Sequence, residues 1–502
     1  MVLWCYNAEG DFMAYFLKQS NLKKGLYLQI YESFYNPEKN QTSHRSVKAL
    51  GYVNDLISED IPDPVAFYKA EVSKMNDERK KEKTRLISSS SAIRHIGYFP
   101  FKAILENLNI SRYIDFFHLT NDFDFKLSDV LSSLIYARAV NPCSKHRTFH
   151  EVMPCLYESY DFSYDQLLEG LGFLGNEYEK IVELFTSQVR DKYGLNTSQT
   201  YFDCTNFYFE IDREDDFRRK GPSKENRRDP IVGLGLLLDA NQIPIGMKMY
   251  PGNESEKPVL RDVINGLKQR HNIEGHTVQV ADKGLNCAEN TYNARQNGDG
   301  YLFSKSVKQL PETEKTWVLL EHGYHDVRDK DGTLKYRWKE CVDKFPYTYT
   351  DSNGKRHTLN LTEKRVVTFN PSLAKKKRIE IERMVEKAIT LSSSMAKRNE
   401  YGETSRYVLF KSTSNGKKTE DKVKTELNQE QIQKDLELAG YNLLVTSEIK
   451  MSAQDIYDTY HNLWRIEESF RIMKTDLDAR PVYLQKEENI KGHFLICYLT
   501  VL

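Results

Sequence analysis

The chain has 502 residues and a net charge of zero, because 72 Lys and Arg residues balance 72 Asp and Glu residues. This length allows about three domains with sizeable cores, and the balanced charge excludes a global field that steers the protein to nucleic acid. The seven cysteines form no CxxC pair and no zinc-module spacing with His, which predicts a reducing compartment and no structural metal. Without a signal-peptide pattern or an apolar stretch of about 18 residues, we expect a cytosolic protein and no membrane partner.

The first part of the chain predicts a small β unit and a helical domain. Residues 23–37 and 44–53 alternate like two strands joined by a polar turn, in a unit assigned to residues 1–75. The charged run 76–85 predicts a solvated helix or a linker. Apolar residues recur at intervals of three and four residues in the segments "FKAILENL", "LSDVLSSLIYARAV" and "YDQLLEGLGFL". Residues 91–195 are therefore expected to be helical, as scaffolding or as a DNA-binding domain.

The segment "TYFDCTNFYFE", residues 200–210, has the alternation of a strand. Strands are depleted in Asp, yet Asp203 lies between Phe202 and Cys204 with no turn residue beside it. Its carboxylate is therefore expected to cap a local group, to pair with a base, or to face a site that requires negative charge.

The following 100 residues predict an ordered series of strands and helices. A hairpin spans residues 229–253, a helix 257–271, a strand 276–284, a helix 287–298 and a strand 300–306. This order is that of an RNase H-like core, although many α/β folds begin in the same way.

Asp282 stands at the end of the apolar strand "TVQVAD", where open α/β sheets place ligand residues. The alternative is an ordinary turn or helix-capping Asp. A second strand carboxylate of this kind, together with Asp203, favours a shared site.

Residues 308–440 are interpreted as an insertion, after which the core resumes at the strand "GYNLLVTSE". The insertion is expected to form its own layer, with strand-like pieces such as "TWVLLEHGYHDV", "LKYRWKEC" and "KRVVTFN", followed by the basic helix "SLAKKKRIEIERMVEKAI". Basic clusters occur at residues 375–378 and 218–228, the second including Lys224, Arg227 and Arg228. A charge run is usually a solvated face, but the second cluster lies near Asp203 in sequence and favours phosphate contact.

A helix is expected from Ser452, which forms a capping-box pattern with Asp455. If the helix continues without a break, Glu467 lies in the middle of its buried stripe. A buried carboxylate needs a partner, and a salt bridge with Arg471 is one alternative to a functional role.

The segment "YHNLWRIEESFRIMK" resembles the Tyr-x2-Arg-x3-Glu-x6-Lys signature of DDE-type insertion-sequence transposases. Tyr460, Glu467 and Lys474 occupy the Tyr, Glu and Lys positions, and Leu463 replaces the Arg. "YFDCTN" and "VADKGLNCAEN" resemble the segments that carry the two family aspartates. The resemblance implies an α/β protein with an RNase H-like mixed-sheet catalytic core in residues 196–307 and 441–502. A β-rich insertion interrupts this core, and the small β unit and the helical domain precede it.

The resemblance also implies chemistry and partners. Asp203, Asp282 and Glu467 would hold two Mg²⁺ ions, for which Mn²⁺ can substitute, and these ions would drive cleavage and strand transfer. Tyr460 and Lys474 would contact phosphates of the transposon end, and Arg471 would take over from the missing Arg. The expected partners are terminal inverted repeats and target DNA, bound by a homodimer in a synaptic complex near a prokaryotic nucleoid in the cytoplasm.

The apolar segment "GHFLICYLTVL" at the end of the sequence suggests a helix cut in mid-course, and hence a fragment or a truncated copy. The alternative function is therefore a catalytically idle protein that still occupies the terminal repeats. A repair nuclease on the same core is a weaker alternative, because it would not need the spacing of Tyr460 and Lys474.

Overall fold

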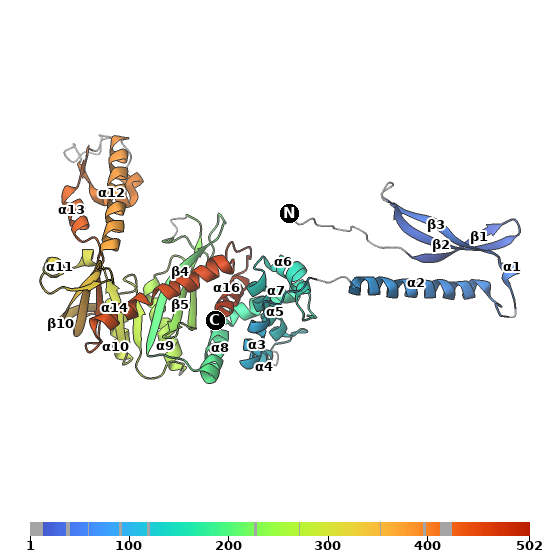
Figure 1. The fold of residues 1–502 in the computed structure, drawn as a ribbon, viewed down its shortest axis with the longest axis horizontal. Coiled ribbons are helices and arrows are strands. Elements are labelled where there is room, and N and C mark those ends of the chain that lie inside the picture. Colours follow the sequence, from blue (N-terminus) through green and yellow to red (C-terminus); the bar gives the residue numbers. More distant parts are fainter. Residues whose placement is uncertain are drawn as a thin grey trace. The chain divides into compact units, whose positions relative to one another are not determined.

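The computed structural model describes residues 14–36, 41–58, 60–89, 93–117, 121–224, 228–270, 272–351, 353–394, 398–411 and 424–502. The chain forms two compact units, Met1–Arg94 and His95–Leu502 (Figure 1).

The first unit is a three-stranded antiparallel sheet with a long helix. Its strands β1 (Tyr15–Leu22), β2 (Gly25–Asn36) and β3 (Gln41–Tyr52) pair in that order, followed by α1 (Val53–Leu56) and α2 (Pro64–Ser89). The sequence predicted β2 and β3 but not β1, whose partly exposed side chains do not alternate. The charged run 76–85 lies within α2, which settles the choice between helix and linker.

The second unit begins with helices that share one core with the central sheet. They are α3 (Phe99–Asn107), α4 (Ile110–Phe116), α5 (Leu127–Val140), α6 (Lys145–Arg147), α7 (Tyr164–Asn176) and α8 (Tyr178–Tyr193). A π-helical turn (Thr148–Val152) and a 3-10 turn (Met153–Cys155) follow α6. The helix α16 (Glu487–Val501) packs against α5 and α7. The approach is so close that a Cβ on Gly175 would lie 1.8 Å from the backbone oxygen of Glu488.

The central sheet has nine strands in the order β6-β5-β4-β7-β8-β14-β11-β10-β9. Their bounds are β4 (Gln199–Tyr208), β5 (Ile231–Asp239), β6 (Pro244–Pro251), β7 (Val278–Ala281), β8 (Gly300–Lys305), β9 (His325–Arg328), β10 (Leu334–Thr350), β11 (Arg356–Phe369) and β14 (Tyr441–Thr446). The strands β4, β7 and β8 are parallel neighbours, and all other pairs are antiparallel. With α9 (Glu256–Gln269) and α10 (Ala288–Gln296), the chain order from β4 to β8 is the expected one.

Most strands of the expected insertion do not form a sheet of their own; only β12 (Val408–Lys411) and β13 (Lys424–Leu427) pair as a separate two-stranded sheet within the described residues. The strands β9, β10 and β11 extend the central sheet, because β11 pairs with β14 along six residues of register. The segment "TWVLL", expected as a strand, belongs to helix α11 (Glu312–Leu319), which buries Val318 against the sheet. The remaining part contains α12 (Pro371–Ser393), a 3-10 segment (Arg398–Tyr407), β12, β13 and α13 (Gln429–Glu437), with small cores around Ile381 and Ala388.

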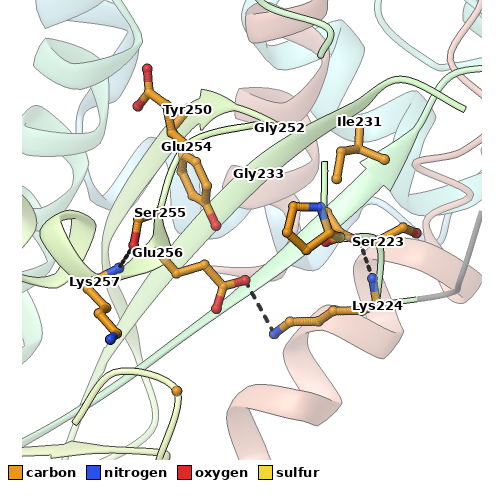
Figure 2. A pocket seen from close by; sticks show the side chains of 13 residues that line it. Ser223, Lys224, Ile231, Gly233, Tyr250, Gly252, Glu254, Ser255, Glu256 and Lys257 are labelled. Carbon is orange, nitrogen blue, oxygen red and sulfur yellow. Dashed lines mark hydrogen bonds and ion pairs between the residues drawn. The ribbon is translucent and has the colours of Figure 1, made fainter. Parts of the chain in front are cut away.

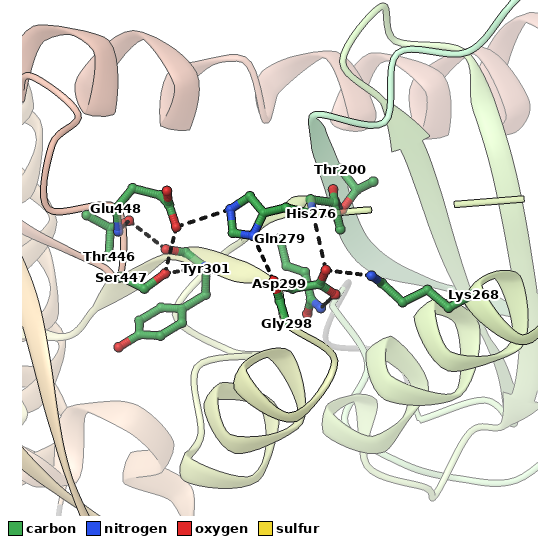
Figure 3. Close-up of polar contacts among 11 residues, drawn as sticks. Thr200, Lys268, His276, Gln279, Gly298, Asp299, Tyr301, Thr446, Ser447 and Glu448 are labelled. Atoms are coloured by element: carbon green, nitrogen blue, oxygen red, sulfur yellow. Dashed lines mark hydrogen bonds and ion pairs between the residues drawn. The ribbon is translucent and has the colours of Figure 1, made fainter. Parts of the chain in front are cut away.

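A buried ion pair connects α9 to the loop before β8 (Figure 3). The carboxylate of Asp299 is fully buried and lies 2.6 Å from the ammonium of Lys268. It also accepts hydrogen bonds from the backbone of Thr277 at 3.3 Å and from the side chain of Gln279 at 3.0 Å. The pair therefore fixes α9 at the edge where β7 and β8 begin.

We expect Lys268→Met to lower the free energy of unfolding by about 3 kcal/mol, because it leaves the Asp299 carboxylate buried without a cation. Urea denaturation measures this change. Lys257→Met is the matched control, since Lys257 is an exposed residue on the same helix, and its change should stay within about 0.5 kcal/mol. Equal losses in both variants would contradict the role assigned to the ion pair.

Candidate active site

Asp203 lies in the middle of the central strand β4. Alternate residues of this strand enter two different cores, with Tyr201 and Phe207 on one side and Phe202 and Cys204 on the other. Asp203 belongs to the side of Tyr201 and Phe207, and 23% of its side chain is exposed. One carboxylate oxygen accepts a hydrogen bond from the backbone N–H of Cys204 at 2.8 Å. The strand thus holds a mostly buried carboxylate in a fixed position.

The parallel pairing of β4 with β7 places Asp282 beside Asp203. In this register Phe202 pairs with Ala281, and each aspartate is the next residue of its strand segment. The two carboxylates therefore lie at the same level of neighbouring segments. Their proximity has an electrostatic effect, because the charge of Asp282 contributes to a raised pKa of Asp203.

Burial is the largest influence on Asp203 and raises its pKa to about 6. The ammonium of Lys224 and the N–H of Cys204 act in the opposite direction, while the charges of Glu256 and Asp282 add to the increase. Three carboxylates thus share one region with a single close ammonium group. The carboxylate of Asp203 is left with too little positive charge around it, and this favours a proton or a metal cation.

Asp282 is held in place by two hydroxyl groups. The same carboxylate oxygen accepts hydrogen bonds from Ser304 on β8 at 2.9 Å and from Tyr460 at 3.1 Å. Burial, followed by the charge of Asp282, raises the pKa of Tyr460, so its hydroxyl remains a donor. Tyr460 was predicted to contact DNA, whereas here its hydroxyl orients an aspartate. Ser304 was not singled out in the sequence, since only the β7–β8 pairing brings it to Asp282.

Lys224 lies near two carboxylates, and Figure 2 shows its ion pair with one of them, Glu256. Its ammonium nitrogen is 3.7 Å from Asp203 and 3.9 Å from Glu256, and it donates a hydrogen bond to the backbone oxygen of Cys204. It also lines a cavity of about 380 Å³ together with Glu256 and Gly284. Lys224 was predicted to bind DNA, but in this structure it partly neutralises the acidic group.

The helix expected from Ser452 is broken near Leu463. It forms α14 (Ala453–His461), α15 (Trp464–Arg471) and a π-helical turn (Ile472–Asp476). Hydrogen bonds from Asn462 to Thr459 and from Ile466 to Leu463 tighten the backbone at the break. This changes the buried face, which after the break consists of Ile466, Phe470 and Met473.

The prediction that Glu467 is buried is therefore wrong. Glu467 is exposed, because the stripe extrapolated at 100° per residue does not continue through the break. The prediction that its carboxylate gathers with Asp203 and Asp282 stays a prediction. No group of three or more His, Cys, Asp or Glu side chains within the described ranges is arranged to hold a metal ion. The structure thus places the two aspartates side by side, with Glu467 on an exposed helix face.

The remaining signature positions lie on the same helical segments. Arg471 contacts Glu468 at 3.8 Å and Asp476 at 3.2 Å rather than Glu467, so the internal salt bridge considered from the sequence is not the one that forms. The ammonium of Lys474 lies 5.3 Å from the ring centre of Phe207, on the face of β4 that also carries Asp203.

The basic segment 218–228 is largely engaged by the protein itself. Arg218 and Arg219 pair with aspartates three residues earlier, at 2.6 and 3.0 Å, and Arg218 is buried. Arg228 is exposed, whereas Arg227 lies outside the described residues. Within its described residues, this segment therefore presents only part of its charge for phosphate contact.

A second cavity, of about 920 Å³, begins at Asp282 and Tyr460. Five cations from the core and from the expected insertion line it: Lys283, Lys305, Lys308, Lys377 and Arg406. The sequence pointed to Lys377 through the basic cluster on α12. The other four cations were missed, because single basic residues carry no signal until the fold gathers them.

The donor set of the two aspartates fits a hard divalent cation. Both supply carboxylate oxygens, the ligand type that Mg²⁺ prefers, and the burial of Asp203 beside the charges of Glu256 and Asp282 raises its pKa in the absence of a metal cation. Asp203 and Asp282 are thus the residues that would hold such an ion, with Asp282 oriented by Ser304 and Tyr460.

Comparison with known proteins identifies the class of this core. A family model described as "Transposase DDE domain" matches residues 202–502, which is more than half of the chain and includes Asp203, Asp282 and Glu467. No curated protein matches the chain. Among the described residues, no helix has the length and apolar character needed to cross a membrane.

The raised pKa of Asp203 predicts an unusual pH dependence of stability. Between about pH 4 and 6 the folded metal-free protein keeps a proton on Asp203 that the unfolded chain has released, so this contribution to stability falls as the pH rises. We expect Asp203→Asn to raise the free energy of unfolding at pH 7.5 by about 2–3 kcal/mol, and to have little effect below about pH 4. Denaturation at a series of pH values in EDTA measures the difference.

Asp216→Asn is the matched control, because the side chain of Asp216 is fully exposed and is expected to show no such increase. A parent protein that is as stable as Asp203→Asn at pH 7.5 in EDTA would contradict the charge deficit inferred around Asp203.

Proposed function

The chain belongs to the DDE-domain transposase family, and from this premise we propose that it cuts DNA at the ends of an insertion sequence and joins these ends to a target. The proposed reactions depend on Mg²⁺ or Mn²⁺. The substrates are the terminal inverted repeats and target DNA, and the acting form is a homodimer in the cytoplasm. The strand order and the parallel β4–β7–β8 centre support an RNase H-like core as the scaffold.

The observation that carries this proposal is the pairing of Asp203 with Asp282. The strand register places these two carboxylates side by side, and Asp203 bears the charge deficit that a cation would offset. Mg²⁺ prefers oxygen ligands, and a bound ion would activate the attacking oxygen and stabilise the leaving oxygen at phosphorus. The protein's own task is to hold the two carboxylates in position, and Ser304, Tyr460 and Lys224 contribute to it.

Glu467 is proposed as the third carboxylate, recruited only when a cation is present. Asp203, Asp282 and Glu256 repel one another near the single ammonium of Lys224. While no ion is bound, solvent therefore stabilises the carboxylate of Glu467 better than this site does. The helix α15 that carries Glu467 packs on β4, and only its apolar face is fixed in the core. A change of side-chain or helix orientation on ion binding is therefore part of the proposal.

A second candidate is a protein that binds the element's ends without cutting them. The observation that favours it is the exposed position of Glu467, together with the lack of a three-carboxylate group in the described part of the chain. The two candidates differ in a single measurement, because only the enzyme produces nicked DNA when Mg²⁺ is added.

Replacement of each acidic residue tests the enzyme against the idle binder. We expect Asp203→Asn and Glu467→Gln to abolish Mg²⁺-dependent cleavage of DNA that carries the element's ends, while gel-shift affinity for the same DNA stays within about threefold. Glu468→Gln is the matched control, since Glu468 is the exposed neighbour on the same helix, and it should cut at the parent rate. If Glu467→Gln cuts as fast as Glu468→Gln, Glu467 has no part in the reaction. A parent protein that binds ends but never cuts them would favour the second candidate.

Tyr460→Phe tests whether this hydroxyl acts on Asp282 or on DNA. The ring remains, but Asp282 loses one of its two hydroxyl donors. We expect cleavage to slow by about 10-fold to 100-fold, with a higher Mg²⁺ requirement and unchanged DNA affinity. Weaker DNA binding with an unchanged Mg²⁺ requirement would instead indicate a phosphate contact. Both quantities follow from cleavage rates and gel shifts over a range of Mg²⁺ concentrations.

A further inference from the structure

A buried group of basic side chains lies between the helical part of the second unit and its last helix. It consists of Arg138 on α5, Lys145 on α6 and His493 on α16, whose exposed fractions are 4%, 5% and 5%. Arg138 and Lys145 lie more than 300 residues before His493, and none of the three was singled out in the sequence as a candidate site residue. Burial of two cationic groups beside an imidazole has a high cost unless a negative charge or an oxygen-rich partner compensates it.

The hydrogen bonds of this basic group assign His493 as a neutral acceptor. Its Nε2 lies 3.0 Å from the backbone oxygen of Ala479, which makes Nε2 the protonated nitrogen. Its Nδ1 then accepts from Lys145 at 3.3 Å and from Arg138 at 3.5 Å. The one lone pair of Nδ1 therefore accepts from two donors. Burial is the largest cause of the lowered pKa of His493, and the charges of Lys145 and Arg138 lower it further.

Donors exceed acceptors around Arg138 and Lys145. The guanidinium of Arg138 donates to the backbone oxygens of Cys143 and Leu477, both at 3.1 Å. Lys145 has His493 as its hydrogen-bond partner, although an ammonium group has three N–H donors. Two N–H groups of Lys145 thus remain for a ligand.

The described structure shows no ion pair between either cation and a carboxylate. Asp478 lines the adjoining cavity, but its exposed carboxylate does not form an ion pair with Arg138 or Lys145. Burial and the charge of Arg138 hold the pKa of Lys145 well below its ordinary value. This differs from the buried cation Arg365, which contacts Glu363 at 2.8 Å and Glu314 at 2.6 Å. It also differs from the buried Lys339, whose ammonium donates to the backbone oxygens of Trp317 and Leu320.

The cavity next to this basic group has a volume of about 530 Å³ and is lined by Arg138, Lys145 and His493. Ser144 and Tyr164 also line the cavity and carry hydroxyl groups. Tyr483, of which 71% is exposed, is another lining residue. The volume exceeds that of a halide or of a single water, so a larger anion has room to reach the two cations.

We propose that this cavity is a binding site for a phosphate group, either free or carried by a nucleotide or DNA strand. A phosphate has several acceptor oxygens, which match the planar fork of Arg138 and the free N–H groups of Lys145. Its negative charge supplies what the buried cations lack. The aromatic ring of Tyr483 offers a stacking surface for an attached base. The inference goes beyond the proposed reaction, because it requires no cleavage step and uses none of the residues near Asp203.

Thermal unfolding at constant ionic strength tests this site, with chloride as the reference anion. We expect inorganic phosphate and deoxythymidine monophosphate to raise the melting temperature of the parent protein, since each would bind only the folded state. Lys145→Met should weaken this response at least tenfold, and Lys145→Arg should retain most of it. Lys192→Met is the matched control, because Lys192 is exposed on α8, and it should respond like the parent.

The responses to inorganic phosphate, deoxythymidine monophosphate and thymidine distinguish a free phosphate from one carried by a nucleotide or DNA strand. Similar responses to inorganic phosphate and the monophosphate indicate recognition of the phosphate alone. A stronger response to the monophosphate, with none to thymidine, indicates a nucleotide or DNA strand. ³¹P NMR of inorganic phosphate with the parent protein is a second measurement, which does not depend on any variant folding. The proposal is overturned if the parent neither broadens the phosphate signal nor gains stability, or if Lys145→Met responds like the parent.

Discussion

The parallel register between β4 and β7 is the constraint on which the candidate site depends. It sets Phe202 opposite Ala281, so the next residue of each segment is an aspartate. Backbone hydrogen bonds in the centre of a nine-stranded sheet maintain this proximity against the repulsion of the two charges. The other contacts of the site involve these two aspartates. Ser304 on the next parallel strand and Tyr460 donate hydrogen bonds to Asp282, and the ammonium of Lys224 lies 3.7 Å from Asp203.

The two aspartates and Glu467 lie on elements that are packed differently. The strands β4, β7 and β8 are buried on both sides, and their side chains enter two separate cores. The helix α15 packs through one face, with Ile466 and Phe470, whereas Glu467 lies on an exposed face. Packing therefore constrains the positions of the two aspartates more closely than that of the Glu467 side chain.

The sequence predicted the strands and helices of the core and two of its acidic residues. Alternation in "TYFDCTNFYFE" and the position of Asp282 after "TVQVAD" were sufficient, because a strand fixes side-chain direction with a period of two. The helix period failed at Leu463, where four short-range backbone hydrogen bonds between Thr459 and Ile466 change the helix without a Gly or Pro to mark the change. Glu256, Ser304 and Arg406 could not be predicted, since their roles arise from pairings between distant segments. The sheet extension by β9, β10 and β11 was missed for the same reason, because the alternation within a strand does not indicate which strand it pairs with.

Although the net charge of the chain is zero, two places in the second unit carry a local excess of charge, negative around Asp203 and positive around Lys145. Around Asp203 the carboxylates of Asp282 and Glu256 exceed the one ammonium of Lys224, and burial, followed by the charges of these carboxylates, raises the pKa of Asp203. Around Lys145 the cations exceed the acceptors, and burial, followed by the charge of Arg138, lowers the pKa of Lys145. Other buried charges, such as Arg365 with Glu363 and Lys268 with Asp299, are matched at contact distance. The contrast between these matched pairs and the two imbalances is the reason for proposing a cation at the first place and a phosphate group at the second.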